Sequence, residues 1–343
     1  MGEVERKLVV AMPTIARYAL TIGLVVLSAC GAVAPRGPTA AAVPTGATLA
    51  TIPVGRAPTL LAIDSAGTRV FAASSGTLSI IATDANAVTS TVRTAPYPTG
   101  VAVTPDGQRV LLTNVSSASM LVVDVASGRT SSIGLVVDIH PGGFGRIAVT
   151  RDGRRAFVTN EPKEYLAVVD LVARQTTEIN LDMRPSDVTL GPGDGTLYVT
   201  GCKEFCTTGT VERIDPTTGK QLGTFAVGGG PYRFALSPDG TRAYTTNLAD
   251  ASLSVVDVAS GQILAKVPAG VEPAGLVVSP DGARVYVAAQ ASNTLTIVDA
   301  ATNSVARTVA LPNGPREIVL SRDGTRAYVS TREAVVVLDT RRL

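Results

Sequence analysis

The stretch Ser279-Pro-Asp-Gly-Ala-Arg-Val-Tyr-Val-Ala-Ala289 joins a tight turn to a short strand rich in β-branched residues. This arrangement recurs seven times along the chain. Two close copies begin at Ser237 and Ser321. The turn glycines recur every 40 to 46 residues, at Gly67, Gly107, Gly153, Gly195, Gly240, Gly282 and Gly324. A repeat of this length, built only from strands and turns, is typical of a β-propeller blade.

The unit from Pro273 to Pro312 shows how one blade is built. Its apolar and half-polar runs predict four antiparallel strands, at residues 275–278, 285–287, 295–298 and 305–309. The first two are joined by Pro280-Asp281-Gly282, which supplies a fixed φ, a side chain that bonds its own backbone and a residue free to take positive φ.

A second turn in each unit carries an aspartate in six of the seven copies. We expect these side chains to accept hydrogen bonds from the turn backbone, a structural role rather than a catalytic one. They are Asp124, Asp170, Asp215, Asp257, Asp299 and Asp339, and the first unit has Ala82 instead.

The two ends of the chain are complementary. The last unit stops shortly after Asp339 and has no outer strand, whereas residues 47–55 resemble residues 262–270 but have no unit before them. The N-terminal strand is therefore predicted to complete the seventh blade and remove an exposed edge. Residues 47–343 then form one all-β, seven-bladed propeller with about 42 residues in each blade.

The repeat resembles the YVTN β-propeller family of exported bacterial and archaeal proteins. The resemblance rests on the Pro-Asp-Gly turns, the Val-Val-Asp strand ends and strands such as Leu197-Tyr-Val-Thr200 and Phe157-Val-Thr-Asn160. It covers the chain from residue 47 onward and implies the fold, but that family has no shared catalytic set. The absence of Trp argues against WD-repeat and kelch propellers, whose blade signatures use that residue.

The N-terminal region predicts export. Residues 19–29 are apolar but too short to span a bilayer, and Leu27-Ser28-Ala29-Cys30-Gly31 resembles the lipobox of bacterial lipoproteins. Residues 1–29 are thus expected to be a lipoprotein signal peptide, with Met12 as an alternative start because Glu3 and Glu5 suit a signal poorly. The alternative is an ordinary cleaved signal with an incidental cysteine.

The expected lipid on Cys30 and the Gly/Pro/Ala-rich residues 30–46 form a flexible linker in this interpretation. The protein would then be exported and attached to the membrane by its lipid anchor only, on the periplasmic or cell-surface side.

Cys202 and Cys206 stand four residues apart at the tip of a predicted hairpin. A disulfide is the favoured interpretation in an oxidising compartment. A metal site would need two more soft ligands, and the chain contains a single His and no further Cys besides Cys30.

The overall charge does not identify a partner. The formal net charge is +2, and no polybasic run or stripe of aromatic and basic residues appears, so nucleic acid is disfavoured. Aromatic residues make up only 4% of the chain, which disfavours an extended sugar-stacking platform.

Candidate binding residues gather on one face of the predicted propeller. We call it the entry face, because it carries the connections into each first strand and those between each second and third strand; residues 138–146, 202–206 and 228–233 are its most irregular loops. The first positions of the seven entry strands should ring the channel mouth. This mouth ring consists of Leu60, Gly100, Arg146, Asp187, Arg233, Gly275 and Glu317.

Four members of the mouth ring are charged, which leaves two interpretations open. Arg146 and Arg233 could clamp a carboxylate, phosphate or other anionic group. Alternatively, Arg146, Asp187 and Arg233 neutralise one another as a salt-bridge cluster with no ligand.

His140 is a further candidate ligand-binding residue, which would need carboxylate or imidazole partners, and Asp138 and Asp187 are the candidates for that role. No second His supports it, and a loop His beside Pro and Gly residues is more typical of a solvated turn.

Three function classes follow from these patterns. The leading expectation is a non-enzymatic binding or scaffold module that needs no cofactor and presents its entry face to an envelope protein or a small anionic ligand. The alternative is a lactonase-type hydrolase using Asp187, Glu317, Arg233 and His140 at the channel mouth. A redox or haem-related role is the third and is disfavoured, because axial ligation and its support need more than one His.

Overall fold

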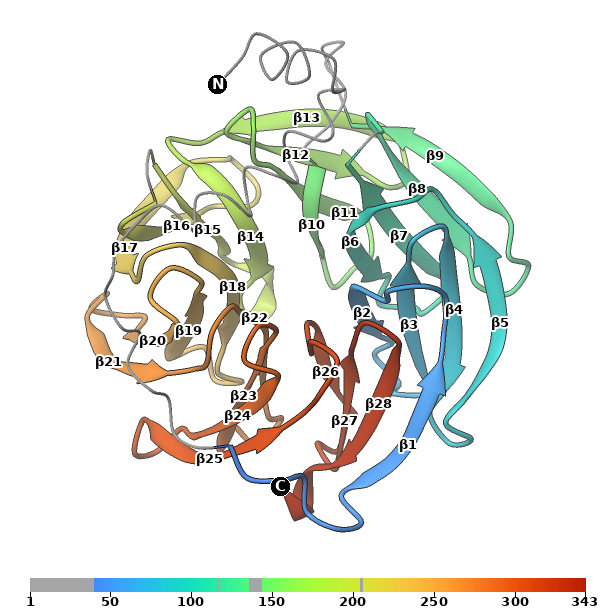
Figure 1. Ribbon diagram of the computed structural model, residues 1–343. Coiled ribbons are helices and arrows are strands. Elements are labelled where there is room, and N and C mark those ends of the chain that lie inside the picture. The colour runs from blue at the N-terminus through green and yellow to red at the C-terminus, as the bar shows by residue number, and fades with distance from the viewer. Residues whose placement is uncertain (1–39, 116, 136–143, 204–205) are drawn as a thin grey trace, which may run out of the picture. The chain divides into compact units, whose positions relative to one another are not determined.

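The computed structural model describes residues 40–115, 117–135, 144–203 and 206–343, all of which belong to the unit Pro38–Leu343. In this unit, 28 strands form seven four-stranded antiparallel sheets, arranged as blades around a central axis (Figure 1). The all-β, seven-bladed propeller predicted from the repeat is therefore confirmed.

Blades 1 to 3 follow one another along the chain. Each runs outward from its innermost strand, which is the first in sequence. Blade 1 contains β2 (Leu60–Ile63), β3 (Arg69–Ser74), β4 (Thr77–Ala82) and β5 (Ala87–Arg93). Blade 2 contains β6 (Pro98–Val103), β7 (Arg109–Asn114), β8 (Ser119–Asp124) and β9 (Thr130–Gly134). Blade 3 contains β10 (Phe144–Val149), β11 (Arg155–Asn160), β12 (Tyr165–Asp170) and β13 (Gln175–Asn180).

Blades 4 to 6 repeat this order. Blade 4 contains β14 (Arg184–Leu190), β15 (Leu197–Cys202), β16 (Gly209–Ile214) and β17 (Gln221–Val227), with a 3-10 turn η1 (Pro192–Asp194) after its first strand. Blade 5 contains β18 (Pro231–Leu236), β19 (Arg242–Asn247), β20 (Ser252–Asp257) and β21 (Ile263–Pro268). Blade 6 contains β22 (Pro273–Val278), β23 (Arg284–Ala289), β24 (Thr294–Asp299) and β25 (Ser304–Ala310).

Blade 7 is assembled from both ends of the chain. It contains β26 (Ile318–Leu320), β27 (Arg326–Ser330), β28 (Ala334–Asp339) and the N-terminal β1 (Thr48–Pro53), and a 3-10 turn η2 (Thr340–Arg342) ends the chain. Strand β1 pairs antiparallel with β28 along its length, from Thr48 opposite Leu338 to Pro53 opposite Ala334. The predicted closure by the N-terminal strand is confirmed.

Part of the expected linker contacts the propeller. Of residues 30–46, the structure describes 40–46, and within them Ala41 forms a parallel bridge to Val309 on β25. The Ala41 N–H donates to the Thr308 carbonyl at 2.9 Å, and Val43 packs against the apolar cluster between blades 6 and 7. Residues just before the closing strand therefore also contact blade 6.

The apolar core lies between neighbouring blades rather than at the centre. Seven buried clusters occupy the seven interfaces, and one of them, with Ile52, Tyr328 and Val335, joins blade 7 to blade 1. Stacking each blade on two neighbours is how repeat folds bury faces that a single unit cannot bury. The inner strands are thereby held in a ring around the channel.

The aspartates of the second turn act as expected. Asp299 accepts from the backbone N–H groups of Ala301 and Thr302 at 3.0 and 2.8 Å, and the other five aspartates accept equivalent turn bonds. These turns and the Asp-Gly turns lie on the face opposite the entry face, which we call the turn face.

Candidate functional site

The mouth ring forms at the inner strands. Its members occupy equivalent places in seven blades, on or next to β2, β6, β10, β14, β18, β22 and β26, which surround the centre in Figure 1. In five blades the register shifts close to this position, which marks a β-bulge. Bulges redirect side chains, so this position is suited to placing a group at the channel.

Hydroxyl groups on the second strands fix the backbone of the charged positions. The N–H of Arg146 donates to Thr159 Oγ1 at 2.9 Å, and the N–H of Arg233 donates to Thr246 Oγ1 at 3.1 Å. The N–H of Glu317 likewise donates to a hydroxyl, Ser330 Oγ, at 3.0 Å. The same backbone-to-hydroxyl hydrogen bond thus fixes three of the charged residues.

Close approach of neighbouring blades explains the two glycines of the ring. A Cβ atom on Gly100 would lie 2.2 Å from the carbonyl oxygen of Gly145, and one on Gly275 would lie 2.6 Å from that of Arg316. Any side chain at these places would force the inner strands apart.

The four charged members form one connected network. Arg146 Nη1 lies 2.9 Å from Glu317 Oε2, Arg233 Nη2 contacts Glu317 Oε1, and Arg233 Nη1 lies 3.4 Å from Asp187 Oδ1. Arg146, Arg233 and Glu317 come from blades 3, 5 and 7, so both contacts of Glu317 cross the channel mouth instead of joining adjacent blades. The repeat pattern predicts that these four residues lie together, but it does not identify Glu317 as the shared acceptor.

The network is buried. The side chains of Glu317 and Arg146 are 3% and 10% exposed, and those of Asp187 and Arg233 are 5% and 15% exposed. Burial alone would raise the pKa of Glu317, but Arg233 and Arg146 outweigh it and lower the pKa below the ordinary 4.5. Glu317 therefore remains ionised between its two arginines.

Asp187 is fixed mainly by backbone groups. Its carboxylate accepts from the N–H of Val188 and from the N–H of Phe234 in the next blade, each at 2.9 Å, in addition to its contact with Arg233. This carboxylate therefore links blades 4 and 5 at the channel mouth.

A second tier lies immediately before the mouth ring in sequence and was missed by the sequence analysis. Its notable members are Tyr232 and Arg316, which precede Arg233 and Glu317 by one residue. The Arg316 Nη2 lies 3.5 Å from the Tyr232 hydroxyl, and the Arg146 guanidinium lies 5.7 Å from the centre of the Tyr232 ring. The sequence does mark this pair, because both side chains are larger than those at the equivalent position of other blades, such as Gly145, Ser186 and Ala274.

The electrostatic environment of Tyr232 is strongly positive. Burial raises the pKa of its phenol, but Arg146, Arg316 and Arg233 outweigh this effect and lower the pKa to about 8. Tyr232 also raises the pKa of Arg316. The Nε atom of Arg316 is buried and has no hydrogen-bond partner among the described residues.

The predicted disulfide between Cys202 and Cys206 is present. It closes the tip between β15 and β16, and the Cys206 carbonyl accepts from the N–H of Gly230 at 2.8 Å. Gly230 precedes Pro231 and Tyr232, so the tip contacts the segment that leads to the channel mouth.

The remaining candidate, His140, lies outside the described residues, as does Asp138. Over the ranges that the structure describes, no set of three or more His, Cys, Asp or Glu side chains is grouped in a way that could hold a metal ion. The same ranges contain no helix with the length and apolar character needed to cross a membrane.

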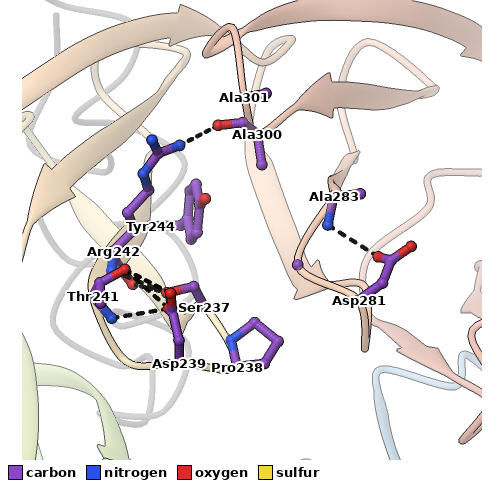
Figure 2. A pocket seen from close by; sticks show the side chains of 11 residues that line it. Ser237, Pro238, Asp239, Thr241, Arg242, Tyr244, Asp281, Ala283, Ala300 and Ala301 are labelled. Atoms are coloured by element: carbon purple, nitrogen blue, oxygen red, sulfur yellow. Dashed lines mark hydrogen bonds between the residues drawn. The ribbon is translucent and has the colours of Figure 1, made fainter.

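A cavity of about 390 Å³ opens on the turn face between blades 5 and 6 (Figure 2). Its charged side chains already have internal partners: Asp239 accepts from Thr241 N at 3.1 Å, Asp281 accepts from Ala283 N at 3.0 Å, and Arg242 donates to the Ala300 carbonyl. The Tyr244 hydroxyl, which also lines the cavity, is buried and has no hydrogen-bond partner among the described residues. The contacts of the charged side chains belong to the repeated turn, so we do not assign a ligand to this cavity.

Comparison with known proteins supports the fold. No protein-family model matches the chain, and no curated protein matches it. A solved structure of hydrazine synthase from Kuenenia stuttgartiensis is similar, with a TM-score of 0.74 and 18% identity over 84% of this chain and 97% of that chain. Because 1597 solved chains match and the identity is low, the likeness shows the propeller architecture alone.

Proposed function

We propose that this protein is an exported, lipid-anchored binding module of the YVTN type that presents its entry face to a partner in the cell envelope. A propeller is suited to this role because its rigid blades position variable loops on one face. The lipobox around Cys30 supports export and anchoring, and the resemblance of the repeat to an exported family supports the same placement.

The observation that carries the proposal is the contrast between the two faces. On the turn face, the aspartates bond their own turns. Arginines on the second strands of several blades also bond a carbonyl of the next blade, as Arg155 does with Pro216 at 2.8 Å and Arg284 with Thr340 at 3.2 Å. The entry face instead carries departures from the repeat that gather around the channel mouth: the disulfide tip, the charged mouth ring, and the pair Tyr232 and Arg316.

The contacts favour binding over acid–base catalysis at the channel mouth. A general acid or base needs a proton affinity near the working pH. Glu317 is held ionised by Arg146 and Arg233, with its pKa lowered, and the Asp187 carboxylate accepts two backbone hydrogen bonds. Glu317 is therefore poorly suited to the hydrolase alternative, and the oxygens of Asp187 are already engaged by protein groups.

Capture of partners from the native envelope tests the proposal. Tyr97 is 64% and Val271 48% exposed, and both lie in entry-face loops, whereas Val172 is 65% exposed on the turn face. We expect Tyr97→Asp and Val271→Asp to lose a crosslinked envelope partner that wild type and Val172→Asp retain. If only Val172→Asp loses the partner, or if the purified protein hydrolyses lactones while all variants capture the same proteins, the proposal is wrong.

A further inference from the structure

We propose that the second tier of the channel mouth binds a carboxylate or phosphate group between Arg316, Tyr232 and Arg146. This inference rests on the proposed use of the entry face for binding and names the chemistry that the face recognises. It also reassigns the anion site: the sequence pointed to Arg146 and Arg233, but the structure shows that Glu317 occupies both.

The charges at the mouth do not balance. The described mouth residues include three arginines and two carboxylates, namely Arg146, Arg233, Arg316, Asp187 and Glu317. Both carboxylates already form ion pairs with Arg146 or Arg233. With Tyr232 neutral, one positive charge remains without a counterion among the described residues, which do not include Asp138. Buried or half-buried charges are costly unless paired, so this site favours an anionic group.

Arg316 is the cation left for a ligand. Its backbone is fixed, because its N–H donates to the Ser330 carbonyl at 2.9 Å, while within the described ranges its guanidinium makes one hydrogen bond, to Tyr232 at 3.5 Å. Its Nε is a buried donor with no partner among the described residues, and a buried donor left without an acceptor destabilises the protein. An acceptor that reaches the Nε and Nη2 edge recovers this energy and forms the paired hydrogen bonds that guanidinium makes with oxyanions.

Tyr232 contacts both of the other residues of the proposed site, Arg316 and Arg146. Its hydroxyl lies at the Nη2 edge of Arg316, and its ring lies beneath the Arg146 guanidinium. A protonated phenol can donate to one oxygen of a bound anion, whereas a phenolate would repel it. Binding of the anion and ionisation of Tyr232 therefore oppose each other. The charged groups nearby that determine the balance between the two are Arg146, Arg233, Arg316 and Glu317.

The test titrates the purified, folded protein with inorganic phosphate and, separately, with acetate at constant ionic strength, by calorimetry. We expect saturable binding of at least one of them at pH 7, weakened about tenfold or more by Arg316→Gln. The matched control is Arg332→Gln, which removes an exposed arginine from the entry face of the same blade and should leave the affinity unchanged. The tighter of the two anions identifies the ligand group as phosphate or carboxylate.

A spectroscopic arm separates a binding role from a structural one. Absorbance at 295 nm should show one tyrosine that ionises with a pKa of about 8, absent in Tyr232→Phe. Saturating anion should raise that pKa, and by linkage the anion affinity should fall from pH 7 to pH 9 in wild type but not in Tyr232→Phe. If Arg316→Gln does not fold, Arg316→Lys, which keeps the charge but loses the fork, replaces it.

Two results would overturn the assignment: no saturable binding by folded wild type, or equal weakening by Arg316→Gln and Arg332→Gln. Because these measurements use the purified protein, they are independent of partner capture. A failed anion titration with an intact entry-face partner would reject this site and leave the proposed function standing.

Discussion

At the scale of single residues, Glu317 is the shared ion-pair partner that holds the channel mouth together. It accepts from two arginines that come from different blades, and it is 2% exposed. Removing one partner of a buried ion pair is far more costly than removing an exposed pair, because the remaining charge stays desolvated. The charged residues of the mouth ring therefore contribute to the stability of the propeller, apart from their role in binding.

We expect Glu317→Ala to lower the free energy of unfolding by about 3–5 kcal/mol, since it leaves Arg146 and Arg233 without their shared counterion. Denaturant unfolding measures the loss. The control is Arg151→Ala, which removes a pair at 3.9 Å whose arginine is 72% exposed, and which should cost less than about 1 kcal/mol.

The same group makes stability depend on pH with a defined sign. Its pKa in the folded state lies below the ordinary value, so its contribution is complete above pH 4.5 and is lost as pH falls through the lower, folded pKa. Glu317→Ala should therefore flatten the acid side of the stability curve relative to wild type. Equal acid slopes in the two proteins would show that the network does not set the pKa.

The sequence predicted which residues meet at the mouth but not how they pair. Equivalent positions in a repeat can be aligned, so Arg146, Asp187, Arg233 and Glu317 could be collected from the chain alone. Pairing across the channel depends on side-chain length and on distances between blades that are not neighbours, which no local pattern records. Tyr232 and Arg316 lie one residue before the mouth ring, so the alignment of the ring positions alone does not include them.

At the scale of elements, the strands were predictable and the entry loops were not. The four strands expected between Pro273 and Pro312 correspond to β22, β23, β24 and β25, because alternating apolar residues and Asp-Gly turns mark them. The bridge from Ala41 to β25 could not be predicted, since a single bridge in a segment rich in Gly, Pro and Ala leaves no periodic pattern.

Closure by β1 gives a prediction at this scale. Deleting residues 47–55 should lower the melting temperature broadly, because β28 loses its antiparallel partner and Ile52 leaves the cluster between blades 7 and 1. Deleting residues 32–39 should not change it. Deleting residues 40–45 should give a small intermediate loss, because it removes the Ala41 bridge and the Val43 contact. Thermal unfolding of the three variants ranks them, and equal effects would contradict closure.

At the scale of the whole molecule, each blade is linked to the next by a buried apolar cluster and often by an arginine. Arg326 closes the ring by donating to the Thr83 carbonyl of blade 1 at 2.6 Å. Leu197 stands where an arginine would join blade 4 to blade 5, and Arg213 reaches the Val258 carbonyl at 3.5 Å instead. The ring is continuous even where the repeat departs from its pattern.

The anchoring of the molecule is also testable at this scale. Cys30, which lies outside the described residues, is the residue expected to carry the lipid. We expect Cys30→Ser to move the protein from the membrane to the soluble fraction while its melting temperature stays the same, because the propeller contains no part of the anchor. Fractionation and a melting curve check both halves. Retention of the variant in the membrane would contradict the lipoprotein assignment.

The pairing of β1 with β28 has a consequence for how the protein is made. A ribosome adds Thr48 almost three hundred residues before Ala334, so the closing strand emerges long before its partner exists. If the chain also crosses a membrane N-terminus first, β1 is delivered first and waits, with an unpaired edge, until the last blade arrives. Only a chain that has been synthesised through β28 can pair with it, so chains that stop before β28 keep an unpaired edge and are exposed to proteolysis.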